Sequence, residues 1–493
     1  MTVGATALRA NRDFRLLWIG QSLSSLGGSV SGVAFPLLVL TTTGSATKAG
    51  LVGLAANAPF VLLQLPLGAY VDRWNRRAVM LCADVGHAVA LGSLAVALAV
   101  DHLAFGHIVA VAPLETSFFV AFRLAEGSSA AGSRPGPGPV GCGIALNQAR
   151  SYGTSLAGDP LGGLLFGIRS LLPFAVDAIS YIASLITIAS VRTPLSAPAA
   201  TGPRHLGREI REGLTAAWSN TFLRTASPLT AGSDVVLNGL FLITLVIATR
   251  HGASPAQVGV MLAIGGTGGM LGALTASALA RRVRSLRLVV AGVAWVAVPL
   301  ILLMAATTNP LLLGILLGLT LSVWPLYNAI VVARRMTQIP DRLIGRVQGA
   351  VALLGWAPVP LAPLLGGVLI ERIGETATVL TFAAMMLTVA LAATTSRQVR
   401  GESATGGDLP QGSSSLWELV GPAKPFACDL RLLTFVSVKG GQTAQPPWPG
   451  HSTRGFPVED RRPAQRVDSI VAGRVARLVR SSVLLPVRRY RTC

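Results

Sequence analysis

The feature that most constrains the fold is a series of long apolar runs that recurs along most of the chain. A helix needs about 20 mostly apolar residues to cross the hydrocarbon core of a bilayer. Twelve runs meet this requirement, near residues 16–40, 46–71, 78–100, 105–125, 142–167, 170–191, 226–249, 256–280, 286–306, 309–333, 346–370 and 375–395. Only 13% of the residues are charged, against about 25% in a soluble domain. We therefore predict an all-α integral membrane protein with twelve transmembrane helices.

The charges between the runs predict the orientation of the helices. One alternate set of connections, with the N-terminus, holds most of the arginines: Arg9, Arg12, Arg15, Arg73, Arg76, Arg77, Arg134, Arg192, Arg204, Arg208, Arg211, Arg224, Arg281, Arg282, Arg284, Arg287, Arg334, Arg335 and Arg342. The other set holds only Lys48, Arg169, Arg250 and Arg372. Because cytoplasmic loops are enriched in Lys and Arg, we predict that both termini are cytoplasmic. These loops also account for the net charge of +20, so nucleic acid is not an expected partner.

The middle connection divides the runs into two sets of six. We predict four parts: an N-terminal six-helix half (1–191), a cytoplasmic central loop with an amphipathic helix (192–225), a C-terminal six-helix half (226–396) and a basic, disordered cytoplasmic tail (397–493). The halves share landmarks at an offset of 204 residues, since Gly68-Ala69 falls on Gly272-Ala273 and Gly162-Gly163 on Gly366-Gly367. Repeats of six spans are typical of transporters. The pattern therefore favours two pseudo-symmetric halves.

A charged hairpin, "GAYVDRWNRR", separates the second and third runs. It resembles the signature loop between helices two and three of the major facilitator superfamily, G-x-x-x-D-R-x-G-R-[RK]. The matching residues are Gly68, Asp72, Arg73, Arg76 and Arg77. Asn75 replaces a glycine, and we expect it to adopt the left-handed turn that Asn tolerates. The resemblance implies a gating loop that holds the cytoplasmic ends of the halves together. The alternative is a topology anchor without a gating role.

A second stretch, "GDPLGG", resembles the G-P-x-x-G-G motif in helix five of the superfamily's exporters. The residues that match are Gly158, Pro160, Gly162 and Gly163, while Asp159 stands where a proline is expected. The segments 11–40, 176–184 and 339–350 are similar to the branch that contains enterobactin exporters and macrolide-efflux proteins. Small residues in such a motif let helices approach closely.

The resemblance implies a secondary transporter that exports an amphipathic small molecule (a drug, macrolide or siderophore) by proton-coupled alternating access. We expect a multi-pass protein of a bacterial plasma membrane that works as a monomer, with a small-molecule substrate, protons and the lipid bilayer as its partners. Two alternatives stay open: a non-transporting, sensor-like membrane protein, and a transporter that works in the uptake direction. The substrate cannot be named from the sequence.

Ionisable residues inside apolar runs are functional candidates, because a charge at membrane depth is costly. These residues are Asp84, Glu115, Asp159, Asp177 and Asp234. In the fold of the superfamily, helices one, four, seven and ten line the central cavity, which favours Glu115 and Asp234 for proton coupling. Asp159 is a further candidate, whereas Asp84 and Asp177 are expected to form structural pairs. Each carboxyl group also has the alternative of a purely structural hydrogen bond.

Other polar residues on the cavity-lining helices are candidates for substrate contact. They are Gln21 on helix one and Trp324, Tyr327 and Asn328 on helix ten. The two aromatic rings are suited to stacking on an aromatic or macrocyclic substrate. Hydrogen bonding between helices is the alternative role.

Some chemistry is not expected. The sequence has no metal-ligand spacing, no P-loop and no nucleophile elbow, so we predict no enzyme, no metal site and no cofactor. The N-terminus lacks a removable signal peptide. Residues 126–141 are rich in Gly, Pro and Ser and predict an unstructured linker. This linker and the tail from about residue 400 are also typical of shifted reading frames in GC-rich DNA.

Overall fold

The computed structural model of the 493-residue chain describes residues 12–71, 74–132, 140–191, 206–282, 286–338 and 344–396. Every regular element in these ranges is a helix. The first half contains α2 (Arg12–Thr43), α3 (Ala46–Val71), α4 (Arg76–Ala99), α5 (Phe105–Gly132), α6 (Val140–Ile168) and α7 (Leu172–Ala189). The second half contains α9 (Thr221–Arg250), α10 (Pro255–Arg282), α11 (Leu286–Met304), α12 (Pro310–Ser322), α13 (Trp324–Gln338), α14 (Ile344–Trp356), α15 (Leu361–Ile373) and α16 (Glu375–Thr395).

Ten helices of the described part are long and apolar enough to cross a membrane. The all-helical membrane class is therefore confirmed. The number of twelve spans stays a prediction, with α6 and α11 at the positions of the fifth and ninth apolar runs. Between the halves, α8 (Leu206–Ser219) forms where the sequence predicts an amphipathic helix.

Asparagine side chains start three of the helices. Asn75 accepts hydrogen bonds from the backbone N–H groups of Arg77 and Ala78 at the start of α4, and Asn220 and Asn309 cap α9 and α12 in the same way. These caps satisfy N–H groups that lack a partner in the first turn of a helix. The expected left-handed turn at Asn75 is wrong, because its φ is −65°. Asn75 replaces the family's glycine as a helix cap.

The helix is interrupted near prolines inside two of the predicted spans. The run at 309–333 forms α12 and α13, with the break at Val323 and Pro325 as the second residue of α13. The run at 346–370 forms α14 and α15, which are separated by a segment that contains Pro358 and Pro360. Proline has no N–H group to continue the helical hydrogen bonds, so a helix ends near it. Both positions still hold a segment long and apolar enough to cross a membrane, Pro310–Val331 and Gly349–Ile373, so the two predicted spans are confirmed as candidates.

The predicted linker at 126–141 is partly wrong. Helix α5 continues to Gly132 and α6 begins at Val140, so much of this segment is helical. Its alanine and serine content is compatible with a helix that extends from a stable apolar segment. Residues 133–139 and the tail from residue 397 lie outside the described ranges.

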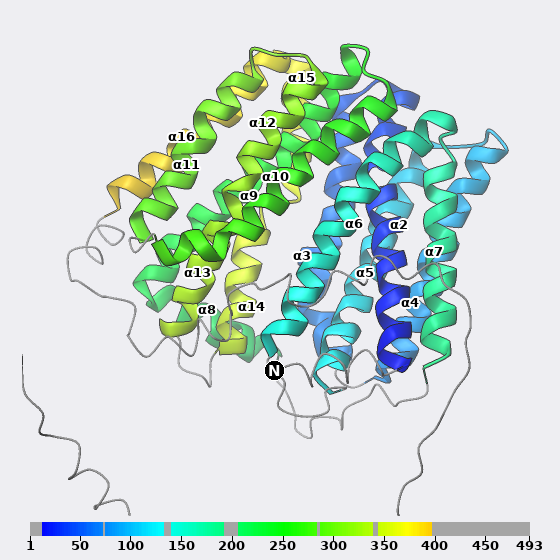
Figure 1. The fold of residues 1–493 in the computed structure, drawn as a ribbon, viewed down its shortest axis with the longest axis horizontal. Helices are drawn as coiled ribbons and strands as arrows, with labels where there is room; N and C mark the ends of the chain where they lie inside the picture. Colours follow the sequence, from blue (N-terminus) through cyan, green and yellow to red (C-terminus); the bar gives the residue numbers. More distant parts are fainter. Residues whose placement is uncertain are drawn as a thin grey trace, which may run out of the picture. The chain divides into compact units, whose positions relative to one another are not determined.

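The two halves pack internally and then against each other (Figure 1). In the first half, α2 packs on α6 and α7, α4 packs on α5 and α7, and α3 packs on α5. In the second half, α10 packs on α12 and α13, while α9 and α11 pack on α16. The main contacts between the halves join α3 to α15 and α6 to α10. We call the end with the α2–α3, α6–α7, α9–α10 and α15–α16 connections the predicted outer end, following the charge rule.

Candidate functional site

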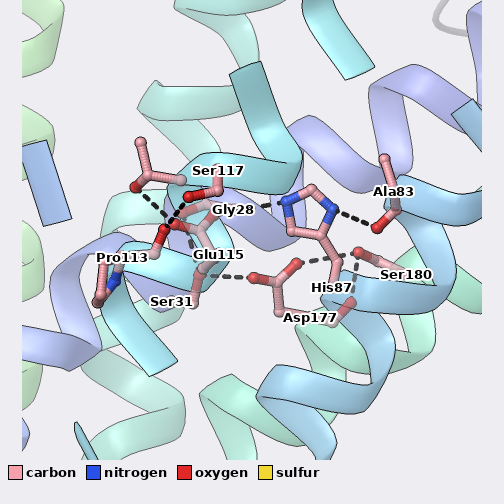
Figure 2. Close-up of polar contacts among 10 residues, drawn as sticks. Gly28, Ser31, Ala83, His87, Pro113, Glu115, Ser117, Asp177 and Ser180 are labelled. Carbon is pink, nitrogen blue, oxygen red and sulfur yellow. Dashed lines mark hydrogen bonds and ion pairs between the residues drawn. The ribbon is translucent and has the colours of Figure 1, made fainter. Parts of the chain in front are cut away.

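A cluster of polar side chains lies inside the first half, where α2, α4, α5 and α7 meet (Figure 2). His87 comes from α4, Glu115 from α5 and Asp177 from α7. The exposed fractions of His87 and Asp177 are 1% and 0%, whereas the side chain of Glu115 keeps 20%. All three helices are candidate membrane spans. Placing ionisable side chains at membrane depth costs free energy, so such a cluster is a candidate functional site.

Asp177 is held by two serine hydroxyl groups. Ser31 Oγ on α2 lies 2.5 Å from Asp177 Oδ2, and Ser180 Oγ lies 3.1 Å from Oδ1. Gly27 leaves space for this arrangement, since a Cβ atom there would overlap Asp177 Oδ1 and Ser180 Oγ. The expectation that Asp177 forms a structural pair is confirmed, and the pair joins α7 to α2.

His87 is fixed by contacts on three sides. Its Nδ1 lies 3.0 Å from the backbone oxygen of Ala83. Its ring stacks on Tyr181 of α7, with centroids 4.0 Å apart and an angle of 1° between the planes. Phe118 lies on another side at 5.8 Å. The remaining nitrogen, Nε2, lies 4.0 Å from Glu115 Oε1 and makes no well-formed hydrogen bond within the described residues, although the Glu115 backbone interacts with the ring.

Asp84 lies on α4, one turn before His87, and its exposed fraction is 0%. Neither carboxyl oxygen makes a well-formed hydrogen bond within the described ranges, although Ser184 of α7 interacts with the group. The expected structural pairing of Asp84 is therefore not confirmed by hydrogen-bond geometry. Together with Glu115 and Asp177, it places three carboxyl groups in the interior of one half. No group of three or more His, Cys, Asp or Glu residues in the described part is arranged to hold a metal ion.

Gln21, a predicted candidate, belongs to a second polar group whose other members, Arg150 and Glu126, were not predicted from the sequence. Arg150 Nη1 on α6 donates to Gln21 Oε1 over 2.5 Å, and Nη2 donates to Glu126 Oε1 of α5 over 3.2 Å. The side chains of Arg150 and Glu126 are only 10% and 18% exposed. An arginine inside an apolar run was the signal available for Arg150, whereas Glu126 was obscured by its assignment to a linker. The structure thus places Gln21 in a link between α2, α5 and α6.

Asp159 and Asp234, the other predicted proton carriers, lie on α6 and α9. No hydrogen bond or ion pair within the described residues joins Asp159 to the cluster around His87. Asp234 is 9% exposed, and its backbone oxygen accepts a hydrogen bond from Asn238. The structure therefore brings Glu115, and not these two residues, next to a titratable partner in the cluster.

The aromatic residues predicted to contact substrate lie on α13. Trp324 and Tyr327 stack with their centroids 4.9 Å apart. Tyr327 is 3% exposed, and its hydroxyl group lies 2.6 Å from Thr230 Oγ1 of α9. Asn328 is exposed. Tyr327 thus forms the hydrogen bond between helices that was the alternative to substrate contact.

The gating loop is described only in part, because Asp72 and Arg73 lie outside the described ranges. Arg77 Nη2 donates to the backbone oxygen of Ala189 at the end of α7, over 2.7 Å. This contact stays within the first half. A Cβ atom at Gly68 would meet no atom of the described residues within 4 Å, so the described helices leave this end of α3 open.

The helix-five motif forms two kinds of close contact. Gly158 and Gly162 lie against α2, where added Cβ atoms would come within 2.5 Å of Ser29 and of the Val30 backbone oxygen. Gly163 faces the other half, and a Cβ there would overlap the backbone of Pro255 and Gly259 on α10. The motif therefore joins α6 to its own half and to the second half, and Asp159 does not prevent this packing.

The contact between α3 and α15 also depends on glycine. A Cβ at Gly50 would lie 2.5 Å from the Pro363 backbone oxygen, and one at Gly53 would lie 2.7 Å from the Pro363 side chain. Gly367 lies in the same way against Ala46. Further along α3, Phe60 contacts Trp356 of α14, with ring centroids 5.0 Å apart.

Glu371 adds polar contacts at the predicted outer end. Its carboxylate accepts hydrogen bonds from Ser45 Oγ over 2.7 Å, from the Thr47 backbone N–H over 3.0 Å and from Thr47 Oγ1. A residue of α15 in the second half thus caps the N-terminus of α3 in the first half. Carboxylates are favourable there because a helix N-terminus is electropositive.

Comparison with known proteins agrees with this architecture. The family model described as "Major Facilitator Superfamily" matches residues 17–357. The multidrug efflux pump Tap of Mycobacterium tuberculosis (strain ATCC 25618 / H37Rv) is 30% identical over 405 residues, which cover 77% of this chain and 92% of that protein.

Solved structures share the fold. A variant of the nucleoside transporter NupG matches with a TM-score of 0.62 at 14% identity, over 78% of this chain and 99% of that one. A bacterial homologue of the human lysosomal transporter Spinster, in an inward-facing and unoccupied conformation, matches with a TM-score of 0.60 at 13% identity, over 79% and 98% of the two chains.

Proposed function

The chain belongs to the major facilitator superfamily, and we propose that it exports amphipathic small molecules from a bacterium by proton-coupled alternating access. Candidate substrates are drugs, macrolides and siderophores, and the location would be the plasma membrane. As a member of a transporter family, the chain is not an enzyme. The proposal of export draws on the similarity to a multidrug efflux pump.

The observation that carries this proposal is the way in which the two halves meet. Glycine contacts join α3 to α15 and α6 to α10 at the predicted outer end. Glu371 adds hydrogen bonds across the same boundary. At the other end of α3, no described residue lies within 4 Å of a Cβ added to Gly68. Such an arrangement is expected of an inward-facing state, in which substrate enters from the cytoplasm.

Transport then requires the halves to exchange one set of contacts for another. The outer contacts would separate, and the cytoplasmic ends of α3 and the facing helices would approach. The glycine surfaces permit this because packing between small residues relies on backbone contact and not on interlocked side chains. Rigid-body rocking of two repeats about a central site is how many secondary transporters alternate.

Proton coupling needs a group inside the bundle that can bind and release a proton. Glu115 meets this need best among the predicted carriers, because it is partly exposed and adjoins the cluster around His87. A carboxyl group removed from water binds protons more readily, so a change of water access during the cycle would change its occupancy. Gln21 of α2 and Arg150 of α6 are joined by a hydrogen bond and provide further polar groups in the same half.

The test is efflux of a fluorescent dye, and of a macrolide and siderophore panel, from cells that express the chain. We expect efflux that stops when a protonophore collapses the proton gradient. Normal expression and membrane insertion with no movement of any substrate would favour the non-transporting alternative. Accumulation in place of loss would favour uptake.

The gating loop has its own test. We expect Asp72→Asn to cut efflux while membrane insertion stays intact, because the variant loses the charge that the loop needs to attract a facing helix N-terminus. Efflux equal to the wild type at equal expression would contradict the gating role and leave the loop as a topology anchor.

A further inference from the structure

The protonation of His87 can be assigned from its neighbours. A backbone carbonyl only accepts hydrogen bonds, so the contact of 3.0 Å with Ala83 requires that Nδ1 carries the proton. In the neutral ring, Nε2 is then an acceptor with a free lone pair. This nitrogen lies 4.0 Å from Glu115 Oε1 and makes no hydrogen bond of good geometry within the described residues, although the backbone of Glu115 also interacts with the ring. Figure 2 shows Nδ1 bound to Ala83 and the opposite edge of the ring directed at Glu115.

The surroundings favour a proton on this pair, because no permanently charged lysine or arginine neutralises the carboxyl groups in the described part. No lysine or arginine in the described part forms an ion pair with Glu115, Asp84 or Asp177. The face of Tyr181 lies against the imidazole ring at 4.0 Å. An aromatic face stabilises a cation, so the stacked Tyr181 ring offsets part of the cost of a positive charge on the buried imidazole.

The neighbouring carboxyl groups are arranged differently. The hydroxyl of Ser31 has a single proton but two acceptors, Asp177 Oδ2 at 2.5 Å and the Gly28 backbone oxygen at 3.2 Å. Ser180 is likewise close to both Asp177 Oδ1 and the Asp177 backbone oxygen. Asp177 is thus held by its own hydrogen bonds to the Ser31 and Ser180 hydroxyl groups. Asp84 is fully buried, so Glu115 is the member of the cluster that is reached from outside.

We propose that Glu115 and His87 form a two-residue proton-binding site in which Glu115 receives the proton and His87 Nε2 accepts it. In the transfer, the O–H bond of Glu115 breaks and an N–H bond forms with the Nε2 lone pair. The products are a carboxylate and an imidazolium, and the total charge of the pair does not change. The two atoms must approach to about 3 Å, or share one water molecule, for this step. The inference rests on the proposed function and names its coupling site.

This site has a mechanical consequence for the first half. Glu115 belongs to α5 and His87 to α4. When the proton is on the ring, the opposite charges attract and draw the two helices together. When the site is empty, the carboxylate faces a neutral ring and this attraction is absent. Occupancy by a single proton therefore changes the packing of α4 against α5.

The chain provides a matched control for the test. His87→Gln places a polar amide near the position of Nε2, but the amide cannot accept a proton. Glu115→Gln removes the acid with little change of shape. His107→Gln is the control, because His107 also lies in this half but binds Ser93 of α4 from the first turn of α5. Each variant is reconstituted in lipid vesicles, and dye transport is measured with an imposed pH gradient and then as exchange without a gradient.

We expect His87→Gln and Glu115→Gln to reduce gradient-driven transport by about tenfold or more, and to slow exchange without a gradient far less. His107→Gln should match the wild type in both measurements. Gradient-driven transport by His87→Gln at the wild-type rate would overturn the proposal. Equal loss of driven transport and exchange would also overturn it, because that result indicates a structural role.

A spectroscopic measurement separates this proposal from the proposed function. The infrared band of protonated carboxyl groups is followed during a pH titration of the purified protein. We expect Glu115→Gln to remove one titrating component and His87→Gln to move its midpoint, whereas His107→Gln leaves it in place. These shifts would support the site even if the wild type transported none of the tested substrates. An unchanged titration in His87→Gln would refute it.

Discussion

At the residue scale, two adjacent glycines on α2 differ sharply in what they face. Gly27 leaves space for Asp177 and Ser180, and an added Cβ would overlap both side chains. The nearest atom to a Cβ at Gly28 is the Tyr181 hydroxyl oxygen, at an ordinary contact distance of 3.7 Å. The buried Asp177 network therefore depends on one of the two positions.

We expect Gly27→Ala to destabilise the protein by about 1–3 kcal/mol, because an overfilled site forces its neighbours to move. Gly28→Ala should instead be neutral or stabilising by up to about 1 kcal/mol, since alanine is the better helix former. Thermal unfolding of both variants in the same detergent measures the difference. Equal midpoints would contradict the close packing of Asp177 against α2.

The limits of sequence reasoning are clearest for these residues. Glu115 was predicted because a carboxyl group in an apolar run is conspicuous by itself. His87 was missed, because its importance comes from Glu115 and Tyr181, which lie on other helices. The rotation of a helix about its axis decides which side chains meet, and a uniformly apolar run carries little information about that rotation. The same reason explains why the link between Arg150 and Glu126 was not foreseen.

At the element scale, the hydrogen bonds of Glu371 on α15 link the two halves, and they can be tested separately from the glycine contacts. We expect Glu371→Gln to weaken the closure at the predicted outer end, because the cap on α3 loses its charge. For a surface site the effect should be about 1 kcal/mol, or a change of about fivefold in the population of the open state. Pulsed electron spin resonance between labels at positions 48 and 372 measures the distance distribution.

The control for Glu371 is Glu375→Gln at the same end. Glu375 lies 3.4 Å from Arg250, and both residues belong to the second half. This variant removes a charge contact inside the second half and leaves the hydrogen bonds of Glu371 across the halves in place. A similar broadening of the distance distribution in both variants would show that Glu371 has no special role in closure.

A second prediction for the elements concerns the helix-five motif. Gly163→Ala would place a methyl group against the backbone of Pro255 and Gly259, and backbone atoms cannot move aside as side chains do. We expect the variant to lose most of its efflux, because α6 and α10 can no longer close. Gly167→Ala is the control on the same helix, since the nearest atoms to its Cβ lie 3.9 Å away. Equal efflux by both variants would contradict the prediction.

The elements were more predictable than the site. Apolar length is a local property, so the helices occur close to where the runs lie, and the amphipathic pattern predicted α8 correctly. The breaks before α13 and α15 follow from Pro325, Pro358 and Pro360, but bilayer helices often tolerate proline, and the sequence alone did not decide between a kink and a break. Contacts such as Glu371 with Thr47 join positions 324 residues apart and depend on how the halves meet.

At the scale of the whole molecule, alternating access predicts that some residues matter only in a state other than the one described. Gly68 is such a residue, since a Cβ there meets no atom of the described part of the chain within 4 Å. We expect Gly68→Leu to leave thermal stability unchanged but to abolish efflux, because the end of α3 must approach the second half when the cytoplasmic side closes.

The repeat-related position of Gly68 gives a contrast: a Cβ at Gly272 would overlap the backbone of Ser322, so Gly272→Leu should lower thermal stability itself. Measuring unfolding midpoints and dye efflux on both variants separates a blocked cycle from a damaged fold. Full efflux by Gly68→Leu would mean that this end of α3 stays apart from the second half throughout transport.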